Sequence, residues 1–427
     1  MSTKFVIPEQ CQYILDKFKA AGFSAYLVGG CVRDSLLGKE PKDWDICTSA
    51  LPEQTIEVFA GEKVILTGLQ HGTVALLRKG MLVEITTYRI DGIYEDNRRP
   101  KEVFFSTDLQ EDLSRRDFTI NALAYHPEEG VVDCFAGQED LQAGILRCVG
   151  KAAARYQEDG LRIMRAIRFA CRFNFVYEKE TKEGILQYSH LLTNIARERI
   201  QVEFNQILVS NNVRRGVQDL AELNCFTYFL PQIEAIYNSQ KQEPIDKGEW
   251  SKMLQALEQI DNELVLRLAV LLYFIGRGEG LAPKEMGNLA MTVLTDLHYD
   301  NQTLKQVVRL LEWMELELSS AEYLLRKGLS VLDAQGFRQL LCLRCAVEYQ
   351  QSIENHKEMR ALLESVEVIL QRGDCYSLKQ LAVKGSDLLD LGYQGIEVGK
   401  KLQELLEIVL HDPSLNEKDY LLQKSKK

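Results

Sequence analysis

The sequence predicts an α+β protein, with a mixed α/β N-terminal region followed by a region that is almost all helix. Up to about residue 148, short apolar runs alternate with Gly and Asp turns, which is typical of strands joined by short helices. Beyond about residue 150, apolar residues recur every three or four positions, as in LKQVVRLLEWMELEL, which is typical of amphipathic helices. The length of 427 residues exceeds one compact core, so we expect several modules.

The pattern predicts where the first elements and the module boundaries lie. We expect a helix from Glu9 to Ala21 and strands within AYLVGG and KDWDI. Further strands are expected at residues 73–77, 81–88 and 122–125. The chain is divided into a head, a neck, a body and a tail, at residues 1–148, 149–205, 206–320 and 321–427.

Composition excludes several classes of protein. The net charge of −11 disfavours a protein that coats nucleic acid, although two Arg-rich segments, at 97–116 and 155–172, allow a local contact. No apolar run reaches the roughly 18 residues of a membrane span, and the N-terminus does not resemble a secretory signal. Ten scattered cysteines fit a reducing compartment, so we expect a cytoplasmic protein that does not enter a membrane.

Three acidic residues are candidates for catalysis. Asp43 and Asp45 are two positions apart in KDWDI, so on an extended strand their carboxylates would share one face. Paired hard oxygen ligands suit Mg²⁺, although a lone DxD more often marks a solvated strand end. Glu84 stands in a strand that is otherwise rich in β-branched residues; taken alone, it is as readily an exposed edge residue.

A glycine pair precedes these acids. In VGGCVRD, Gly29 and Gly30 stand where a strand turns into a helix, so phosphate oxygens could approach the backbone N–H groups there. Arg33 follows as a partner for phosphate charge, although a glycine pair alone often marks only a tight turn. Each feature alone has an ordinary structural explanation. Together, the glycines, the DxD and the strand glutamate favour a site for two-metal phosphoryl transfer.

A series of segments then resembles a known family. These are LVGGCVRDSLLGKEPKDWDICTSALPEQ, TTYRIDGIYEDNRRP, EDLSRRDFTINALAY, DCFAGQEDL and YQEDGLRIMRAIRFA, across about residues 25–175, with a weaker continuation in ARERIQVEF. In that order they resemble the polymerase-beta-type nucleotidyltransferases, specifically the class II CCA-adding enzymes and their bacterial poly(A) polymerase relatives. The resemblance implies a nucleotidyltransferase head, an all-α neck, body and tail, and addition of the 3′-terminal CCA to tRNA from CTP and ATP.

The same resemblance implies roles for particular residues. Asp43 and Asp45 would hold two Mg²⁺ ions, with Glu84 as an electrostatic or general-base support. Arg116 of RRDFTINALAY would bind the nucleotide, with Asp117 and Asn121 as supports of the site. The helical body and tail would bind the acceptor and TΨC arms of the tRNA.

Nucleotide choice would belong to a polar stripe in the neck. Asp159, Arg162, Arg165 and Arg168 follow one another at steps of three, so on one helix they would share a face. A salt-bridged solvated helix is the ordinary explanation of such a stripe; the resemblance implies instead that it reads the base edge as a protein template. Glu158 would then orient Asp159 and Arg162.

Two further features bear on the kind of enzyme. Gly92 lies in the run TTYRIDGIYEDNRRP, where CCA-adding enzymes carry a flexible loop, so we expect addition of all three nucleotides.

Many relatives carry a phosphohydrolase His-Asp pair, and the matching position holds Tyr273 and Phe274, so we expect a catalytically silent helical remnant. An A-adding enzyme or a poly(A) polymerase is an alternative, and a catalytically inactive RNA-binding relative is an alternative of another class.

Overall fold

A computed structural model describes most of the chain. It covers residues 5–66, 68–92, 94–95, 99–100, 103–239, 248–348 and 353–426. The chain folds into two compact units, Met1–Pro231 and Gln232–Lys427, and each is described by itself. Within the described ranges, no helix is long and apolar enough to cross a membrane.

A mixed sheet forms the centre of the head. Its strands follow the order β11 (Gly130–Asp133), β10 (Leu123–His126), β1 (Ala25–Val28), β2 (Asp45–Thr48), β5 (Met81–Thr87), β4 (Thr73–Arg78) and β3 (Lys63–Ile65). Neighbouring strands of this sheet pair antiparallel, except that β2 and β5 run parallel. The strands expected from the sequence are therefore present, with ends shifted by one to three residues.

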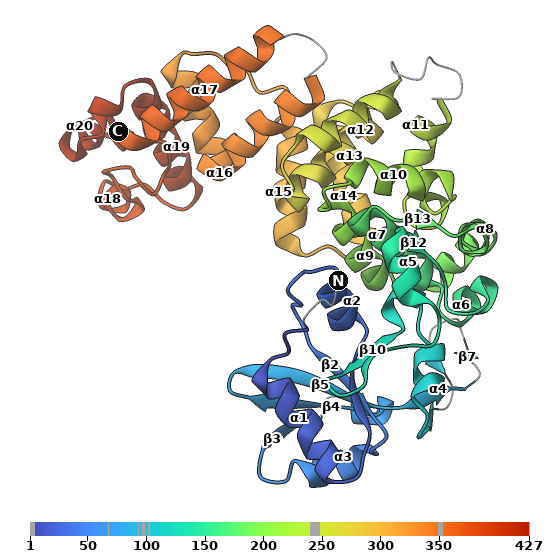
Figure 1. The fold of residues 1–427 in the computed structure, drawn as a ribbon. Coiled ribbons are helices and arrows are strands. Elements are labelled where there is room, and N and C mark those ends of the chain that lie inside the picture. Colours follow the sequence, from blue (N-terminus) through green and yellow to red (C-terminus); the bar gives the residue numbers. More distant parts are fainter. Residues whose placement is uncertain are drawn as a thin grey trace. The chain divides into compact units, whose positions relative to one another are not determined.

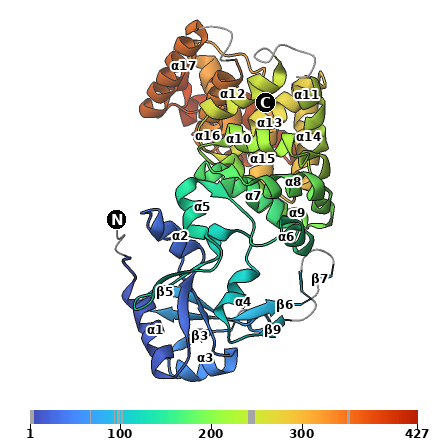
Figure 2. The same cartoon turned by 45° about the vertical axis from the view of Figure 1, so that its right-hand side comes forward.

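The two faces of this sheet are covered differently because side chains alternate along each strand. One face, carrying Leu27, Ile46 and Ile85, packs into a core with α1 (Glu9–Ala20), which lies against the sheet in both views (Figures 1 and 2). The opposite face carries Val28 and Cys47, which cluster instead with residues near α4 (Leu109–Ser114). Residues at the odd positions of β2 therefore point away from α1.

Short elements complete the head. They are α2 (Gly30–Leu36), α3 (Pro52–Val58), η1 (Leu69–His71), η2 (Thr119–Asn121) and the paired short strands β6 (Arg89–Asp91) with β9 (Val103–Phe105) and β7 (Tyr94–Glu95) with β8 (Arg99–Pro100). Gly92 joins β6 to the part of the expected flexible loop, at residues 93, 96–98 and 101–102, that lies outside the described residues. The loop stays a prediction.

Helices dominate the rest of the first unit. They are α5 (Gly137–Ala143), α6 (Ala152–Glu158), α7 (Leu161–Phe173), α8 (Lys179–Tyr188), α9 (Arg197–Leu208) and α10 (Val213–Glu222), with η3 (Ser189–Asn194), η4 (Phe226–Tyr228) and the two-residue strands β12 (Ile145–Leu146) and β13 (Val176–Tyr177). Helix α7 buries an apolar face that includes Ile163, Met164 and Ile167, and packs against α9 and α10. This packing fixes the helix that carries most of the expected polar stripe.

The second unit consists of helices. They are α11 (Glu234–Ser239), α12 (Glu249–Gln259), α13 (Leu264–Gly278), α14 (Pro283–Asp296), α15 (Asn301–Glu312), α16 (Glu322–Glu348), α17 (Ile353–Arg372), α18 (Gly385–Asp390), α19 (Ile396–His411) and α20 (Lys418–Lys424), with η5 (Pro231–Ile233) at the junction and η6 (Pro413–Leu415) near the end. Helix α16 bends at Asp333, which has φ 59° and ψ 176° and whose side chain accepts a hydrogen bond from Gly336 N at 2.9 Å. The expected α+β class, with an almost all-helical C-terminal part, is confirmed.

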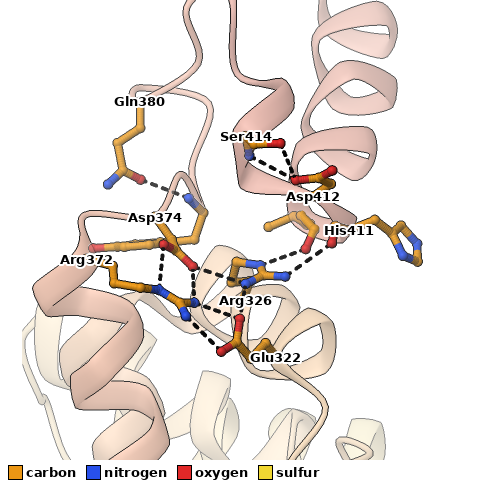
Figure 3. A network of polar contacts seen from close by, with 10 residues as sticks. Glu322, Arg326, Arg372, Asp374, Gln380, His411, Asp412 and Ser414 are labelled. Atoms are coloured by element: carbon orange, nitrogen blue, oxygen red, sulfur yellow. Dashed lines mark hydrogen bonds and ion pairs between the residues drawn. The ribbon is translucent and has the colours of Figure 1, made fainter.

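A buried arginine links three segments of this unit (Figure 3). Arg326 of α16 is 3% exposed; its Nη1 donates to Asp374 Oδ2 at 3.0 Å and to Glu322 Oε2 at 2.9 Å. Its Nε and Nη2 donate to the carbonyl oxygens of Leu410 and His411, at 2.7 and 3.2 Å. A buried charge is stable only when it is paired and hydrogen-bonded, and this one is both.

Candidate active site

Two of the three expected carboxylates lie on adjacent strands. Asp45 is the first residue of β2 and stands opposite Glu84 of β5 in the parallel register. Both alternate with core residues, so they point to the face of the sheet away from α1. Asp45 is half-buried and Glu84 is exposed, which puts two acids side by side on one partly accessible face of the sheet.

Asp43 does not lie on the strand. It is exposed in a bend, and β2 begins only at Asp45, so the expected pairing of both aspartates on one strand face is wrong. The intervening Trp44 turns into the core and is 7% exposed, which fixes the backbone between the two acids. The negative charge of Asp43 is nevertheless near enough to contribute to the raised pKa of Asp45.

The electrostatics of Asp45 reflect this crowding. Burial first, and then the negative charges of Glu84 and Asp43, raise the pKa of Asp45 to about 6, while the nearby positive charge of Arg116 partly opposes them. Like-charged oxygens held this close are stabilised by a cation. Among the described residues, however, no cluster of three or more His, Cys, Asp or Glu is arranged to hold a metal ion.

The glycine turn brings a backbone segment close to Arg116. Gly29 has φ 78° and ψ −124°, a conformation that glycine adopts readily and other residues rarely, and its N–H donates to Leu123 O at 3.0 Å. A Cβ on Gly29 would lie 2.9 Å from Arg116 Nη1. Gly30 follows as the first residue of α2. The turn, Arg116 and Asp45 therefore share one part of the head.

Arg116 is held from the other side by a buried acid. Its Nη2 donates to Asp112 Oδ2 at 3.2 Å, and the neighbouring Arg115 donates to Asp112 Oδ1 at 2.7 Å. The Nε atom of Arg116 is buried and has no hydrogen-bond partner among the described residues. A buried donor left in this state is costly unless a ligand or water satisfies it.

Arg33 and Asn121 lead from this turn toward the neck. Arg33 is 5% exposed, and its Nε and Nη2 lie 2.8 and 2.7 Å from Asp34 Oδ1. Its Nη1 donates to Asn121 Oδ1, and the guanidinium stacks over Phe173 with its Cζ 4.8 Å from the ring centroid. All three nitrogen atoms of Arg33 are thus engaged, and contact with phosphate, which stays a prediction, would require one of them to change partner.

Asp117 continues the chain of contacts. Its Oδ1 accepts from Asn121 Nδ2 at 3.0 Å, and its Oδ2 accepts from Arg165 Nε at 2.8 Å. Burial alone would raise the pKa of Asp117, but the charge of Arg165 and the hydrogen bonds from Asn121 and Arg165 outweigh it and lower the pKa to about 2. Asp117 therefore stays ionised and connects the head to α7.

The polar stripe is only partly one helical face. Arg162, Arg165 and Arg168 lie on α7, as expected. Asp159 does not: it follows α6 with extended backbone angles, φ −141° and ψ 104°, and its Oδ1 accepts from Leu161 N at 3.0 Å. The expectation of one helix is thus wrong for Asp159, because the Asp-Gly pair ends α6 and starts a new helix.

Each polar residue near α7 has its own partner. Glu158 accepts from Arg162 Nη1 at 2.5 Å and from Arg155 Nη2 at 2.5 Å, and Arg162 Nη2 donates to Arg115 O at 2.9 Å. Among the described contacts, Asp159 pairs instead with Arg199 of α9. Glu158 therefore contacts Arg162, and its expected role in orienting Arg162 and Asp159 stays a prediction.

Two residues of α9 were not singled out by the sequence. Arg199 contacts both carboxylate oxygens of Asp159, at 3.3 and 2.8 Å. Glu203, 7% exposed, accepts from Arg168 Nε and lies 3.7 Å from Arg165 Nη1. Both belong to the ARERIQVEF segment, whose weak resemblance to the family was the available signal.

Known proteins are similar to this chain over nearly its whole length. A family model described as Poly A polymerase head domain matches residues 25–147, and one described as Probable RNA and SrmB- binding site of polymerase A matches residues 174–237. The chain is 35% identical over 417 residues to the CCA-adding enzyme of Anoxybacillus flavithermus, covering 96% of this chain and 95% of that relative. The chain belongs to the CCA-adding enzyme family.

Other members support the assignment. The CCA-adding enzyme of Ligilactobacillus salivarius is 46% identical over 215 residues, which are 50% of this chain and 53% of that one. A crystal structure of the Bacillus stearothermophilus CCA-adding enzyme in complex with CTP aligns with a TM-score of 0.74 and 27% identity, covering 98% of each chain. The resemblance stated from the sequence motifs is thereby confirmed.

The expected phosphohydrolase remnant lies in the second unit of this family member. Tyr273 and Phe274 are on α13; Phe274 is buried, and the Tyr273 hydroxyl lies 3.3 Å from Arg277 Nη1. Aromatic side chains at these positions pack and hydrogen-bond within the helical unit. The absence of phosphohydrolase activity stays a prediction.

Proposed function

We propose that this protein adds and repairs the 3′-terminal CCA of tRNA, using CTP and ATP and releasing pyrophosphate. The observation that carries the proposal is the 35% identity, over nearly the entire chain, to a protein named CCA-adding enzyme. The grouping of Gly29, Asp45, Glu84 and Arg116 in one part of the head supports it, because these are the residue types that nucleotidyl transfer needs.

The residues present fit a divalent cation. Asp43 and Asp45 supply hard carboxylate oxygens. The pKa of Asp45 is raised first by burial and then by the negative charges of Glu84 and Asp43, which Mg²⁺ would offset. Two Mg²⁺ ions held by these residues would supply Lewis-acid chemistry, lowering the pKa of the tRNA 3′-hydroxyl and stabilising the charge on the triphosphate and the leaving pyrophosphate. Glu84, beside Asp45, adds negative charge at the same place and serves as an electrostatic or general-base support.

Phosphate binding follows from the turn and its arginine. The backbone at Gly29 and Gly30 is free of side chains, so a triphosphate can approach its N–H groups. Arg116 lies directly beside this turn, and its buried Nε, which has no hydrogen-bond partner among the described residues, suits a phosphate oxygen. Arg33 supports the turn from within, through Asn121 and Asp117.

Base selection is assigned to the neck. Asp159 offers acceptor oxygens, and Arg162, Arg165 and Arg168 offer donors, which cytosine and adenine edges can satisfy while guanine and uracil present mismatched patterns. Arg165 has the most exposed side chain of the three arginines, at 34%, so it is the most accessible to a base. Its neighbours are held by Glu158 and Glu203.

The remaining modules follow from the same proposal. We assign residues 1–148 to the nucleotidyltransferase head, 149–205 to the nucleotide-selecting neck, 206–320 to the body and 321–427 to a tail that binds the acceptor and TΨC arms. The place of action is the cytoplasm, which agrees with the ten cysteines, all of them free thiols.

Incorporation assays test the function directly. CTP and ATP are supplied separately and together to tRNAs that lack CCA, CA or A, and the products are resolved at single-nucleotide length. Clean termination at CCA is expected. Addition of A only to tRNA ending in CC would make this an A-adding enzyme, and an open-ended adenosine tail would make it a poly(A) polymerase. No pyrophosphate release with either nucleotide would indicate a catalytically inactive RNA-binding relative.

A further inference from the structure

A groove of about 650 Å³ opens beside Asp43 on the head. Three segments line it: the stretch before α1, the connection from the end of α2 to β2, and the start of β5. Asp43 is the one predicted metal ligand among the lining residues. The groove therefore borders one residue of the proposed catalytic centre.

The groove lies at the opposite end of α2 from the proposed triphosphate site. Ser35 and Gly38, at the C-terminal end of α2, line it, whereas Gly29 and Gly30 are at the N-terminal end. A helix of this length separates its ends by roughly 10 Å, given about 1.5 Å per residue. In an in-line displacement the attacking oxygen enters opposite the leaving pyrophosphate. The groove thus borders Asp43 away from the end of α2 at which the triphosphate is proposed to bind.

The lining of the groove combines apolar and basic groups. Val6 and Leu82 are 79% and 49% exposed, so they offer apolar surface that solvent now covers. Lys39 and Lys42 are exposed at the same rim, and Glu40 also lines the groove. The Nζ of Lys39 lies 5.2 Å from the centroid of the Phe173 ring.

The combination of apolar and basic side chains in the groove favours one kind of ligand over others. A free phosphate would use the lysines but leave the apolar surface exposed. An apolar peptide segment would cover that surface but would lie against two lysines and two acids. A single strand of RNA offers base faces to apolar side chains and phosphates to lysines in alternation.

We propose that this groove binds the single-stranded 3′ end of the tRNA primer, with a base against Val6 and Leu82 and phosphates against Lys39 and Lys42. The strand would leave the groove at Asp43, where its terminal hydroxyl meets the nucleotide. This inference rests on the proposed function, since it names the binding site of the second substrate.

Salt dependence of binding tests the phosphate contacts. Binding of a fluorescently labelled tRNA lacking CCA is measured without nucleotides, from low to moderate salt, for wild type and for the double variant Lys39→Ala/Lys42→Ala. Each lost phosphate contact flattens the slope of log K against log salt by about 0.7–0.9, so the pair should flatten it by about 1.4–1.8. The control, Lys17→Ala/Lys63→Ala, removes two exposed head lysines outside the groove and should leave the slope unchanged.

Steady-state kinetics and crosslinking test the position of the strand. The groove double variant should raise KM for the tRNA about tenfold while KM for CTP stays constant. A photoreactive p-benzoylphenylalanine in place of Leu82 should crosslink to the last nucleotides of the tRNA. An unchanged salt slope would overturn the proposal, as would a crosslink confined to the tRNA stem or to a second protein chain. The salt slope is measured without nucleotides and so does not depend on catalysis. The proposal for the groove can therefore be refuted while CCA addition is confirmed, and CCA addition can be refuted while tRNA still binds in the groove.

Discussion

Replacing Glu203 with glutamine tests whether the neck arginines are positioned by α9. The carboxylate is 7% exposed and faces Arg168 and Arg165, so solvent screens these contacts little. Charge-assisted hydrogen bonds contribute about 1.5–3 kcal/mol, and glutamine retains one acceptor oxygen. We therefore expect Glu203→Gln to lower the free energy of unfolding by about 2 kcal/mol.

The same substitution should affect which nucleotide is chosen. An arginine that is less firmly held distinguishes base edges less sharply, so we expect the preference for CTP and ATP over UTP and GTP to fall about tenfold, which corresponds to about 1.4 kcal/mol. Urea denaturation and single-turnover incorporation of each of the four nucleotides measure the two effects. Glu198→Gln, at an exposed position of the same helix, is the matched control. A destabilised variant with unchanged selectivity would refute the positioning role of Glu203.

Three other substitutions test separate contacts. Gly29→Ala should cost about 1–3 kcal/mol through backbone strain and displace Arg116, raising KM for both nucleotides; an unchanged KM would place the triphosphate elsewhere. Asp117→Asn tests a carboxyl whose pKa falls from 3.8 to about 2 on folding, so its stabilisation, of about 2 kcal/mol, is present above pH 4 and lost as the pH falls toward 2. The variant should be less stable at pH 7, and its free energy of unfolding should change less between pH 4 and pH 2 than that of the wild type. The same pH dependence in both proteins would contradict the assignment. Asp374→Asn weakens the pairing of Arg326 and should lower the urea midpoint by the equivalent of about 2 kcal/mol; an unchanged midpoint would show that the other contacts of this arginine suffice.

The sequence predicted the features that depend on local pattern. The run around Glu84, rich in β-branched residues, predicted a strand there, and in the structure this strand, β5, sets Glu84 opposite Asp45 of β2. The helical period after residue 150 likewise predicted α7 and its three arginines. Such patterns are local because each depends on residues two to four positions apart.

The failures have local and long-range causes. Asp43 was expected on the strand, but Trp44 is drawn into the core and the strand starts after it. Asp159 was expected on a helix, although the Asp-Gly pair was a visible signal for a break. The partners Arg199 and Glu203 lie 40 and 35 positions from the residues they hold, and no spacing rule connects positions so far apart.

The most direct test of the central claim is single-turnover addition of CMP and AMP by Asp43→Ala, measured beside the binding of the tRNA. The control is Asp16→Ala, which removes an exposed acid on α1. If Asp43 is part of the cation site, both additions should fall by about 10²–10³-fold or more, while the tRNA binds as tightly as before. Turnover close to that of the control, with either nucleotide, would contradict the assignment of catalysis to these carboxylates.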